Sequence, residues 1–232
     1  MTMHVYESYR TACKNEWNAA VNHRFNQELV ADTLADDVLR RYLIQDWQYT
    51  SGFYSLLGQA IASADLLSSK IRLSRQLGFI SNDEDTYFHD RFEQFNVSHA
   101  ELDNPQLTPS SLGITKLYAD TVQTRSYADA IAVLCVAESL YLDWAQTLTN
   151  EGRNVPRKEQ NLGWIRVHRD AGFKNWVDFL IQELNRLGSP NNEELKSRFA
   201  RAVHWELAFF DDAYRGIGIP QDSGAIISNH DS

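Results

Sequence analysis

Three carboxylic acids stand where the helical pattern of the sequence calls for apolar residues. Asp46, Glu138 and Glu206 each interrupt an apolar stripe with a period of about 3.6 residues. Tyr49 and Tyr141 follow the first two acids by three residues and therefore share their helix faces. A buried carboxylate is costly unless it is paired, and burial raises its pKa toward the range useful for proton transfer. The three acids together predict a polar pocket inside a helical bundle.

A second interpretation of these acids is purely structural. Each carboxylate could simply accept hydrogen bonds from a tyrosine, histidine or arginine of the core. The coincidence of three such acids, two with a tyrosine one turn away, favours the pocket. Of the seven histidines, His168 is the candidate for this pocket, with a satisfied core histidine as the alternative. His23 is expected to fix the junction after the first helix.

Two cysteines, Cys13 and Cys135, both fall in apolar helical stretches. Buried thiols without a disulfide are the usual meaning of this pattern, and they fit a reducing cytoplasm. Cys135 precedes Glu138 by three residues, but no histidine base is close to it in the sequence. We therefore predict that Cys135 is a packing residue and not a nucleophile.

The elements that would position these residues are helices. Periodicity predicts them over residues 5–21, 34–64, 68–77, 115–124, 127–149, 160–168, 173–187 and from Ser189 and Pro190 to about 214, with a further helix carrying Phe88, Phe92 and Phe95. Expected boundary signals are Thr33 with Asp36, a stop at Gly78, a capping box of Ser81 with Glu84, and an N-cap at Ser189. Residues 96–109 are expected to be a connection.

Composition agrees with one all-α domain of about eight helices over residues 1–220, followed by a tail over 221–232. The 232 residues are 43% hydrophobic and include only 5 Pro and 11 Gly, which disfavours a turn-rich β fold. The longest apolar run, Ile131–Ala137, is far shorter than the ~20 residues that span a bilayer. The net charge of −9, without a basic cluster, argues against nucleic acid as a partner. The N-terminus shows no targeting segment, so a cytoplasmic location is expected.

Several segments carry a resemblance to a known family. They are Tyr42-Leu43-Ile44-Gln45-Asp46-Trp47-Gln48-Tyr49 with Phe53, the preceding His23-Arg24-Phe25, then Trp164-Ile165, and Glu206 to Tyr214. Together they resemble the TenA family (thiaminase II, aminopyrimidine aminohydrolase) over residues 5–215. The resemblance implies a haem-oxygenase-like helical bundle, a buried pocket for a 4-amino-2-methylpyrimidine, no cofactor, and a homodimer or homotetramer.

The resemblance also implies roles for individual residues in substrate binding. Asp46 matches the aspartate that holds the pyrimidine amino group and ring nitrogen, and Tyr49 matches its aromatic neighbour. Tyr118 is similar to the pocket tyrosine of the family. His168 lies where the cysteine branch of the family often carries a tyrosine. These residues are expected to bind the substrate, with the tyrosines on the two sides of its ring.

One position departs from the best-known branch of the family. If Tyr141 matches the family's tyrosine, Ala137 stands where that branch has its nucleophilic cysteine, and Glu138 follows directly. The sequence therefore resembles a second branch in which a glutamate replaces the thiol. Glu138 and Glu206 are expected to be the catalytic pair, because one carboxylate can activate water while another group protonates the departing nitrogen. The expected reaction is hydrolysis of an aminomethylpyrimidine, or of its N-formyl derivative, to hydroxymethylpyrimidine in thiamin salvage.

Two other functions remain open from the residues. A di-metal oxygenase would use Glu and His from the bundle, but none of the acids at Glu84, Glu93, Glu138 or Glu206 is followed by a histidine three residues later, as such sites require. No metal site is therefore expected. A non-catalytic aminopyrimidine-binding or regulatory protein would bind the ring without turnover. Metal analysis and a turnover assay separate these functions from hydrolysis.

Overall fold

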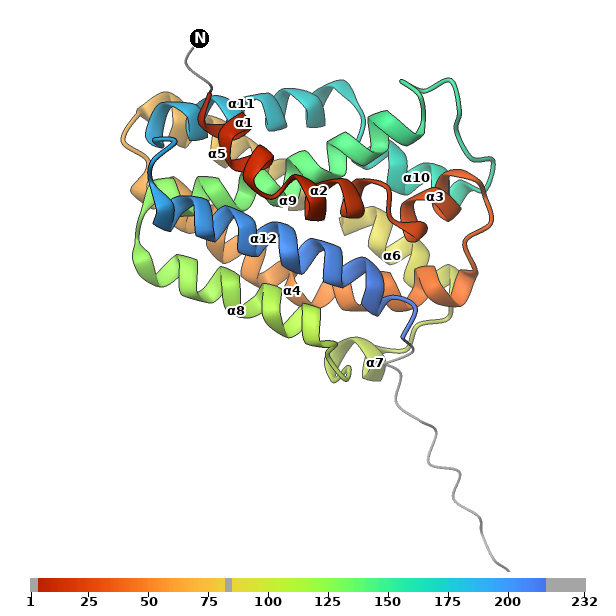
Figure 1. Cartoon of the computed structure of the whole chain (residues 1–232). Coiled ribbons are helices and arrows are strands. Elements are labelled where there is room, and N and C mark those ends of the chain that lie inside the picture. The colour runs from red at the N-terminus through yellow and green to blue at the C-terminus, as the bar shows by residue number, and fades with distance from the viewer. Residues whose placement is uncertain (1–3, 82–84, 216–232) are drawn as a thin grey trace, which may run out of the picture.

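The computed structural model describes residues 4–81 and 85–215. These residues form twelve α-helices and no strand (Figure 1), which confirms the all-α expectation. The helices are α1 (Val5–Ala12), α2 (Lys14–Val21), α3 (Arg24–Val30), α4 (Asp36–Ser63), α5 (Leu67–Phe79), α6 (Asp85–Gln94), α7 (His99–Asp103), α8 (Pro109–Thr124), α9 (Tyr127–Leu148), α10 (Glu159–Val167), α11 (Ala171–Leu187) and α12 (Glu193–Asp212). Among them, no helix is both long enough and apolar enough to cross a membrane.

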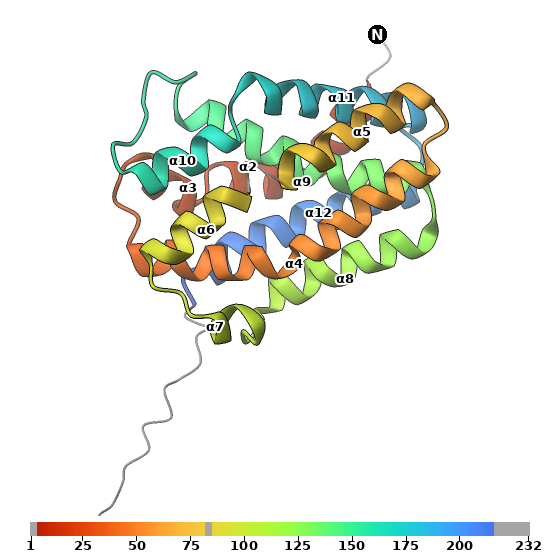
Figure 2. The ribbon, with the colours of Figure 1, turned by 180° about the vertical axis from the view of Figure 1, so that it is seen from behind.

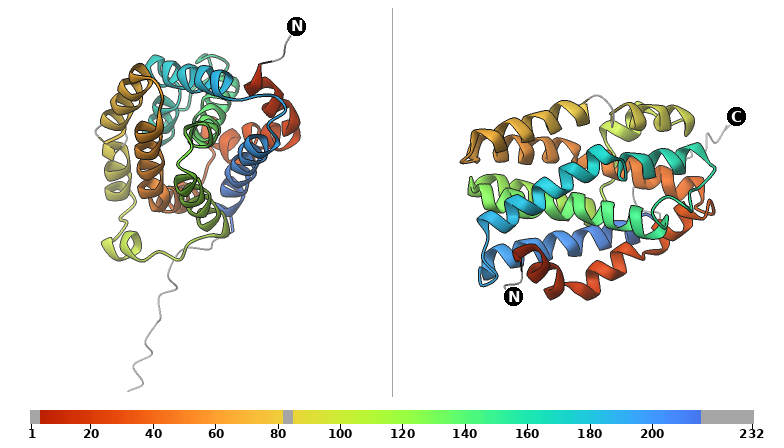
Figure 3. Two further views of the ribbon diagram at one scale, coloured as in Figure 1. Left: turned by 90° about the vertical axis from the view of Figure 1, so that its left-hand side faces the viewer. Right: turned by 90° about the horizontal axis from the view of Figure 1, so that it is seen from above.

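Helix α9 forms the centre of the bundle. Every side chain from Ala130 to Val136 is fully buried, as expected for a helix that is apolar on all sides. Seen along the bundle, α9 lies among α4, α8, α11 and α12 (Figure 3). Glu138, which follows this run on α9, is 8% exposed and must therefore be accommodated inside the protein.

Helices α4, α8 and α12 pack beside α9 (Figure 1). The 28-residue helix α4 carries Asp46 and Tyr49 near its middle and has α8 along one flank. Seen from behind, α5 and α6 cover another side of α4 (Figure 2). The midpoints of α4, α8, α9 and α12 thus converge on one region of the core.

The N-terminal half contains more breaks than periodicity predicts. The expected helix over 5–21 is interrupted at Cys13, which ends α1 and begins α2. The apolar period continues through this turn, and no Gly or Pro marks it, so the sequence pattern does not reveal the break. The short helix α3 was not expected either, but His23 does occupy the predicted junction. Its Nδ1 accepts a hydrogen bond from Phe25 N at 3.1 Å and caps α3.

Three expected helix boundaries are wrong. Helix α4 begins after Ala35, because Thr33 N donates to Glu28 O at 2.9 Å and Thr33 therefore belongs to the end of α3. Helix α5 does not stop at Gly78 but continues to Phe79. The cap of α12 is Asn192, whose side chain accepts from Leu195 N at 3.1 Å, in place of Ser189.

The segment over 96–109 is also more ordered than a connection. A complete capping box of Ser98 and Glu101 begins the short helix α7, and Thr108 caps α8, which starts at Pro109. These elements bring the number of helices in the described residues to twelve, compared with about eight expected. The predicted Ser81–Glu84 capping box and the predicted tail over 221–232 fall outside the described residues.

Both cysteines are buried free thiols, as expected. Cys13 Sγ donates to Tyr9 O at 3.2 Å, and Cys135 is fully buried in α9. Burial raises the pKa of both thiols, and of Cys13 to about 11, so each remains protonated at neutral pH.

Candidate active site

A single cavity in the middle of the bundle contains all seven residues singled out from the sequence. It encloses about 710 Å³ of space not filled by protein, part of which opens to solvent. Asp46 and Tyr49 come from α4, Tyr118 from α8, Glu138 and Tyr141 from α9, His168 from the end of α10, and Glu206 from α12. The three acids are each at most 8% exposed. The fold therefore brings together side chains from five helices, and their chemical roles stay predictions.

One face of α4 supplies much of the cavity wall. Asp46, Tyr49, Thr50 and Phe53 all line it, at the spacing of neighbours on one helix face. Gly52 lies beside this face and allows α8 to approach, because a Cβ at Gly52 would lie 3.2 Å from the Tyr118 ring. The absence of a side chain at Gly52 therefore helps to place Tyr118 at the cavity.

Glu206 has a strongly perturbed environment. Burial raises the pKa of this carboxyl to about 8, and the nearby charges of Asp46 and Glu138 act in the same direction, whereas hydrogen bonding from Tyr141 opposes them. Glu206 Oε2 is buried and has no hydrogen-bond partner among the described residues. Glu206 is therefore largely protonated at neutral pH, with an oxygen available to a ligand.

The tyrosines of the site are hydrogen-bond donors. Burial raises the pKa of Tyr49, Tyr118 and Tyr141 well above its usual value, and the charge of Glu206 is among the further causes for each. Tyr49 and Tyr118 meet edge to face, with ring centroids 6.1 Å apart and an interplanar angle of 85°. These two rings are therefore nearly perpendicular, and the placing of the tyrosines on the two sides of the substrate ring stays a prediction.

His168 is a neutral, oriented histidine. Its Nδ1 lies 2.9 Å from Trp164 O, and because a carbonyl only accepts, Nδ1 carries the hydrogen. Burial lowers the pKa of His168 to about 4. The ring packs on Trp164, Tyr141 and Phe173, with centroid distances of 4.4, 4.8 and 5.2 Å. This tautomer leaves Nε2 as a hydrogen-bond acceptor.

Ala137 and Cys135 occupy different places on α9. Ala137 lines the cavity next to Glu138, whereas Cys135 is not among the lining residues. Ser139 Oγ donates a hydrogen bond to the backbone oxygen of Cys135, and Ser139 does not line the cavity either. The structure thus places a carboxylate, and not a thiol, beside the position that Ala137 occupies.

Further lining residues were not predicted from the sequence as site residues. They are Trp47, Thr50, Phe53, Tyr54, Ile80, Phe88, Ala137, Trp164 and Phe173. Phe53 could have been found, because it continues the Asp46 face of α4. Phe88 was expected only in the core, and no pattern in the segments around Ile80 and Phe173 relates these two residues to the cavity. They form a mostly apolar wall, which suits a flat organic ligand.

No group of three or more His, Cys, Asp or Glu side chains in residues 4–81 and 85–215 is arranged to hold a metal ion. The three acids of the cavity, Glu206, Glu138 and Asp46, all contribute to the raised pKa of Tyr118, after its burial. Metal analysis of the purified protein remains the test of the di-metal alternative.

The raised pKa of Glu206 predicts a pH dependence of stability. Its carboxyl binds a proton more tightly in the folded protein, with a pKa of about 8, than at the ordinary value of 4.5. The resulting stabilisation is complete below the ordinary pKa and is lost as pH rises through about 8. Between about pH 5 and pH 8, the free energy of unfolding of the parent protein should therefore fall by about 3 kcal/mol more than that of Glu206→Gln, which lacks the titrating carboxyl. Urea unfolding of both proteins at the two pH values measures it, and parallel pH slopes would contradict it.

Comparison with known proteins gives a consistent result. The sequence profile of the TENA/THI-4/PQQC family matches residues 10–216. The aminopyrimidine aminohydrolase of Bacillus subtilis (strain 168) is 23% identical over 216 residues, which cover 91% of this chain and 90% of that protein. The aminopyrimidine aminohydrolase of Helicobacter pylori is 25% identical over 207 residues, which cover 86% of this chain and 93% of that protein.

Solved structures resemble the fold over nearly its whole length. A TenA homologue from P. horikoshii OT3 has a TM-score of 0.82 at 18% identity and covers 92% of this chain and 100% of its own. A putative TenA-like thiaminase from Sulfolobus solfataricus P2 has a TM-score of 0.79 at 15% identity, with coverages of 93% and 98%. These similarities confirm the expected haem-oxygenase-like helical fold.

Proposed function

The chain belongs to the TENA/THI-4/PQQC family, and from this premise we propose that it is a hydrolase that cleaves a C–N bond of an aminopyrimidine. Two relatives named aminopyrimidine aminohydrolase support this reaction class. The observation that carries the proposal is the buried cluster of Asp46, Glu138 and Glu206 around one cavity with mostly apolar walls. Such a cavity can bind a flat ring and carry out acid–base chemistry beside it.

The proposed substrate is 4-amino-5-aminomethyl-2-methylpyrimidine or its N-formyl derivative, and the product is hydroxymethylpyrimidine, a precursor in thiamin salvage. Asp46 accepts hydrogen bonds from the aminopyrimidine edge. Glu138 takes a proton from water, whose oxygen forms the new bond to the methylene carbon. Glu206 gives its proton to the nitrogen that leaves as the C–N bond breaks. Tyr49, Tyr118, Tyr141 and His168 complete the walls that hold the ring.

Ala137 and Glu138 support a further proposal, that this chain is of the branch with a glutamate in place of the nucleophilic cysteine. Covalent attack on a thiamin pyrimidine requires a soft nucleophile. Ala137 offers none, and the buried thiol of Cys135 is outside the cavity wall. We therefore expect thiamin to be a poor substrate compared with the aminomethylpyrimidines.

The deciding experiment incubates the purified protein separately with aminomethylpyrimidine, its N-formyl derivative and thiamin. Ammonia, formamide, formate and hydroxymethylpyrimidine are measured for each, because cleavage of the methylene C–N bond of the N-formyl derivative releases formamide and hydrolysis of its formyl group releases formate. Release of hydroxymethylpyrimidine with the matching nitrogen product supports the proposal and ranks the substrates. Tight binding of all three without any product would refute hydrolysis and support the non-catalytic aminopyrimidine-binding alternative.

Asp46→Asn should mainly weaken substrate recognition. The substitution keeps the shape of the side chain but removes its charge and makes one of its ends a donor, so it can no longer accept from both the amino group and a protonated ring nitrogen of the aminopyrimidine edge. We expect KM to rise by at least the factor by which kcat falls, about tenfold or more for a lost charge-assisted hydrogen bond. Steady-state kinetics measures both constants. A fall in kcat at unchanged KM would place Asp46 in the chemical step instead.

The oligomeric state and the location also belong to this proposal. We propose a homodimer or homotetramer located in the cytoplasm, with a small-molecule pyrimidine and not a nucleic acid or a membrane as the partner of the site. Light scattering at micromolar concentration measures the assembly, and a monomer would refute this part while leaving the proposed chemistry unchanged.

A further inference from the structure

Tyr42 lies directly behind the cavity wall. Its hydroxyl is 2.6 Å from the hydroxyl of Tyr141, which lines the cavity, whereas Tyr42 itself is not a lining residue and is 1% exposed. The two tyrosines come from different helices, α4 and α9. Tyr42 therefore contacts the site only through another side chain.

Aromatic neighbours hold the Tyr42 ring on several sides. Phe25 stacks on it with ring centroids 4.4 Å apart, Phe209 lies at 4.8 Å, Trp164 at 5.8 Å and Phe210 at 6.1 Å. An apolar core would pack as well with a phenylalanine at this position. The Tyr42 hydroxyl is thus a polar group in an aromatic cluster, and its described partner is Tyr141.

Either hydroxyl can donate in this hydrogen bond, and a charge on Glu206 decides between the two directions. A tyrosine hydroxyl has one hydrogen to donate. Tyr141 and Glu206 both line the cavity, and hydrogen bonding from Tyr141 favours the charged form of Glu206. When Tyr141 gives its hydrogen to the carboxylate, its oxygen can only accept from Tyr42. The chain of donors then runs from Tyr42 to Tyr141 to Glu206.

We propose that Tyr42 is a positioning residue for the hydrolysis, which orients and polarises the Tyr141 hydroxyl toward the Glu206 carboxylate that forms when the proton leaves. This inference rests on the proposed function for its role in catalysis. Glu206 becomes charged only as its proton passes to the departing nitrogen, in a buried site that contains two other acids. A hydrogen-bond donor that the fold places beside this developing charge stabilises the transition state more than it stabilises the complex with bound substrate.

Other titratable groups face Glu206 from the helices packed against α12. Asp46, Tyr42 and Tyr49 come from α4, Tyr118 from α8, and Glu138 and Tyr141 from α9. The titratable groups of α1 and α2 that contact α12 do not line the cavity. Tyr6 and Tyr9 on α1 pack on Phe199, and Glu16 on α2 hydrogen-bonds His204 at the surface. Of these groups, Tyr141 is the one whose hydrogen bond favours the charged carboxylate.

The test measures the protonation of Glu206 and turnover separately. The infrared band of the protonated Glu206 carboxyl is identified as the band that Glu206→Gln removes. Its intensity, followed over pH without substrate, gives the midpoint at which Glu206 loses its proton. Loss of the Tyr42 donor weakens the bond from Tyr141, so Tyr42→Phe should raise the midpoint of this band by about half a pH unit. With substrate, kcat should fall by about tenfold and KM should change by less than about threefold.

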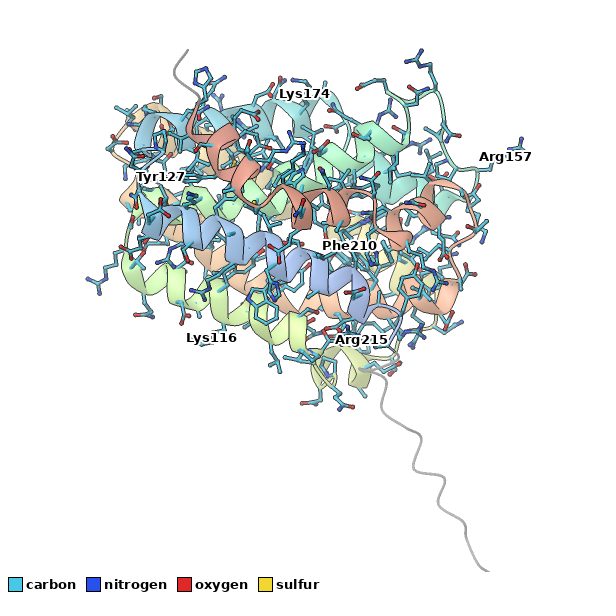
Figure 4. The ribbon with its side chains drawn as sticks, in the orientation of Figure 1. Lys116, Tyr127, Arg157, Lys174, Phe210 and Arg215 are labelled. Carbon is cyan, nitrogen blue, oxygen red and sulfur yellow. The ribbon has the colours of Figure 1, made fainter. Side chains whose placement is uncertain are left out.

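Tyr127→Phe is the matched control. The Tyr127 hydroxyl is also buried and donates to a carboxylate, Glu183, at 2.5 Å. Figure 4 shows Tyr127 toward one end of the bundle and Phe210, a neighbour of Tyr42, far from it. This control should reduce thermal stability but leave the Glu206 midpoint and kcat as in the parent protein. Equal kinetic effects of the two variants would overturn the proposal.

A double variant tests whether Tyr42 acts through Tyr141. In a Tyr141→Phe background, Tyr42→Phe should cause no further fall in kcat and no further midpoint shift, because the intermediate group is gone. Additive effects would overturn the relay. If the parent protein turns over none of the pyrimidines, the proposed function fails. The infrared midpoints still decide the relay in that case, and an unshifted Tyr42→Phe midpoint would refute it.

Discussion

Replacing Glu206 with Gln should lower kcat by roughly 10²–10⁴ while substrate still binds. The amide keeps the shape of the side chain but carries no proton that can pass to the leaving nitrogen. Because the pKa of Glu206 is raised to about 8, the acid form that donates this proton predominates at neutral pH. Activity of the parent protein should therefore decline as pH rises through about 8. The measurements are kcat over pH and a binding titration with the pyrimidine product.

Glu183→Gln is the control for this variant. Glu183 is also a buried glutamate, at 6% exposed, but it bonds Ser69, Tyr127 and Arg186 away from the cavity. Its loss should reduce stability and leave kcat of the folded protein within a few-fold of the parent. If Glu206→Gln retains the parent kcat, or if the decline above about pH 8 survives in it, Glu206 is not the proton donor.

Replacing Glu138 with Gln should cause a loss of similar size, again roughly 10²–10⁴ in kcat. Glu138 lines the cavity beside Ala137 and is the acid that we assign to water activation. A glutamine cannot take a proton from water, so turnover should fall with little change in binding. Steady-state kinetics and a product-binding titration separate the two effects.

Cys135→Ala distinguishes this assignment from a thiol mechanism. Cys135 is fully buried in the core of α9, and its raised pKa keeps it protonated. Turnover of this variant should stay within a few-fold of the parent. An inactive Cys135→Ala protein together with an active Glu138→Gln protein would place the chain functionally with the cysteine branch and would refute our assignment.

Local sequence pattern identified which residues are out of place in an apolar core. A period of about 3.6 residues marks the buried face of each helix, so an acid on that face, such as Asp46 or Glu206, is visible without any structure. The same pattern predicted the helical class and most of the long helices. It missed the break at Cys13, because a turn without Gly or Pro leaves the apolar period uninterrupted.

The tertiary structure decided what these faces meet. Periodicity shows that a face is buried, but not which helix covers it, since contacts between helices depend on their crossing and register. For this reason the seven candidate residues could be predicted from the sequence, but the apolar part of the cavity wall that Ile80 and Phe173 add from other segments could not. The neutral tautomer of His168 and the Tyr42–Tyr141 hydrogen bond likewise exist only because separate segments meet in the fold. The raised pKa of Glu206 has the same origin, because burial and two other acids act on it only after α4, α9 and α12, which carry the three acids, have packed around one cavity.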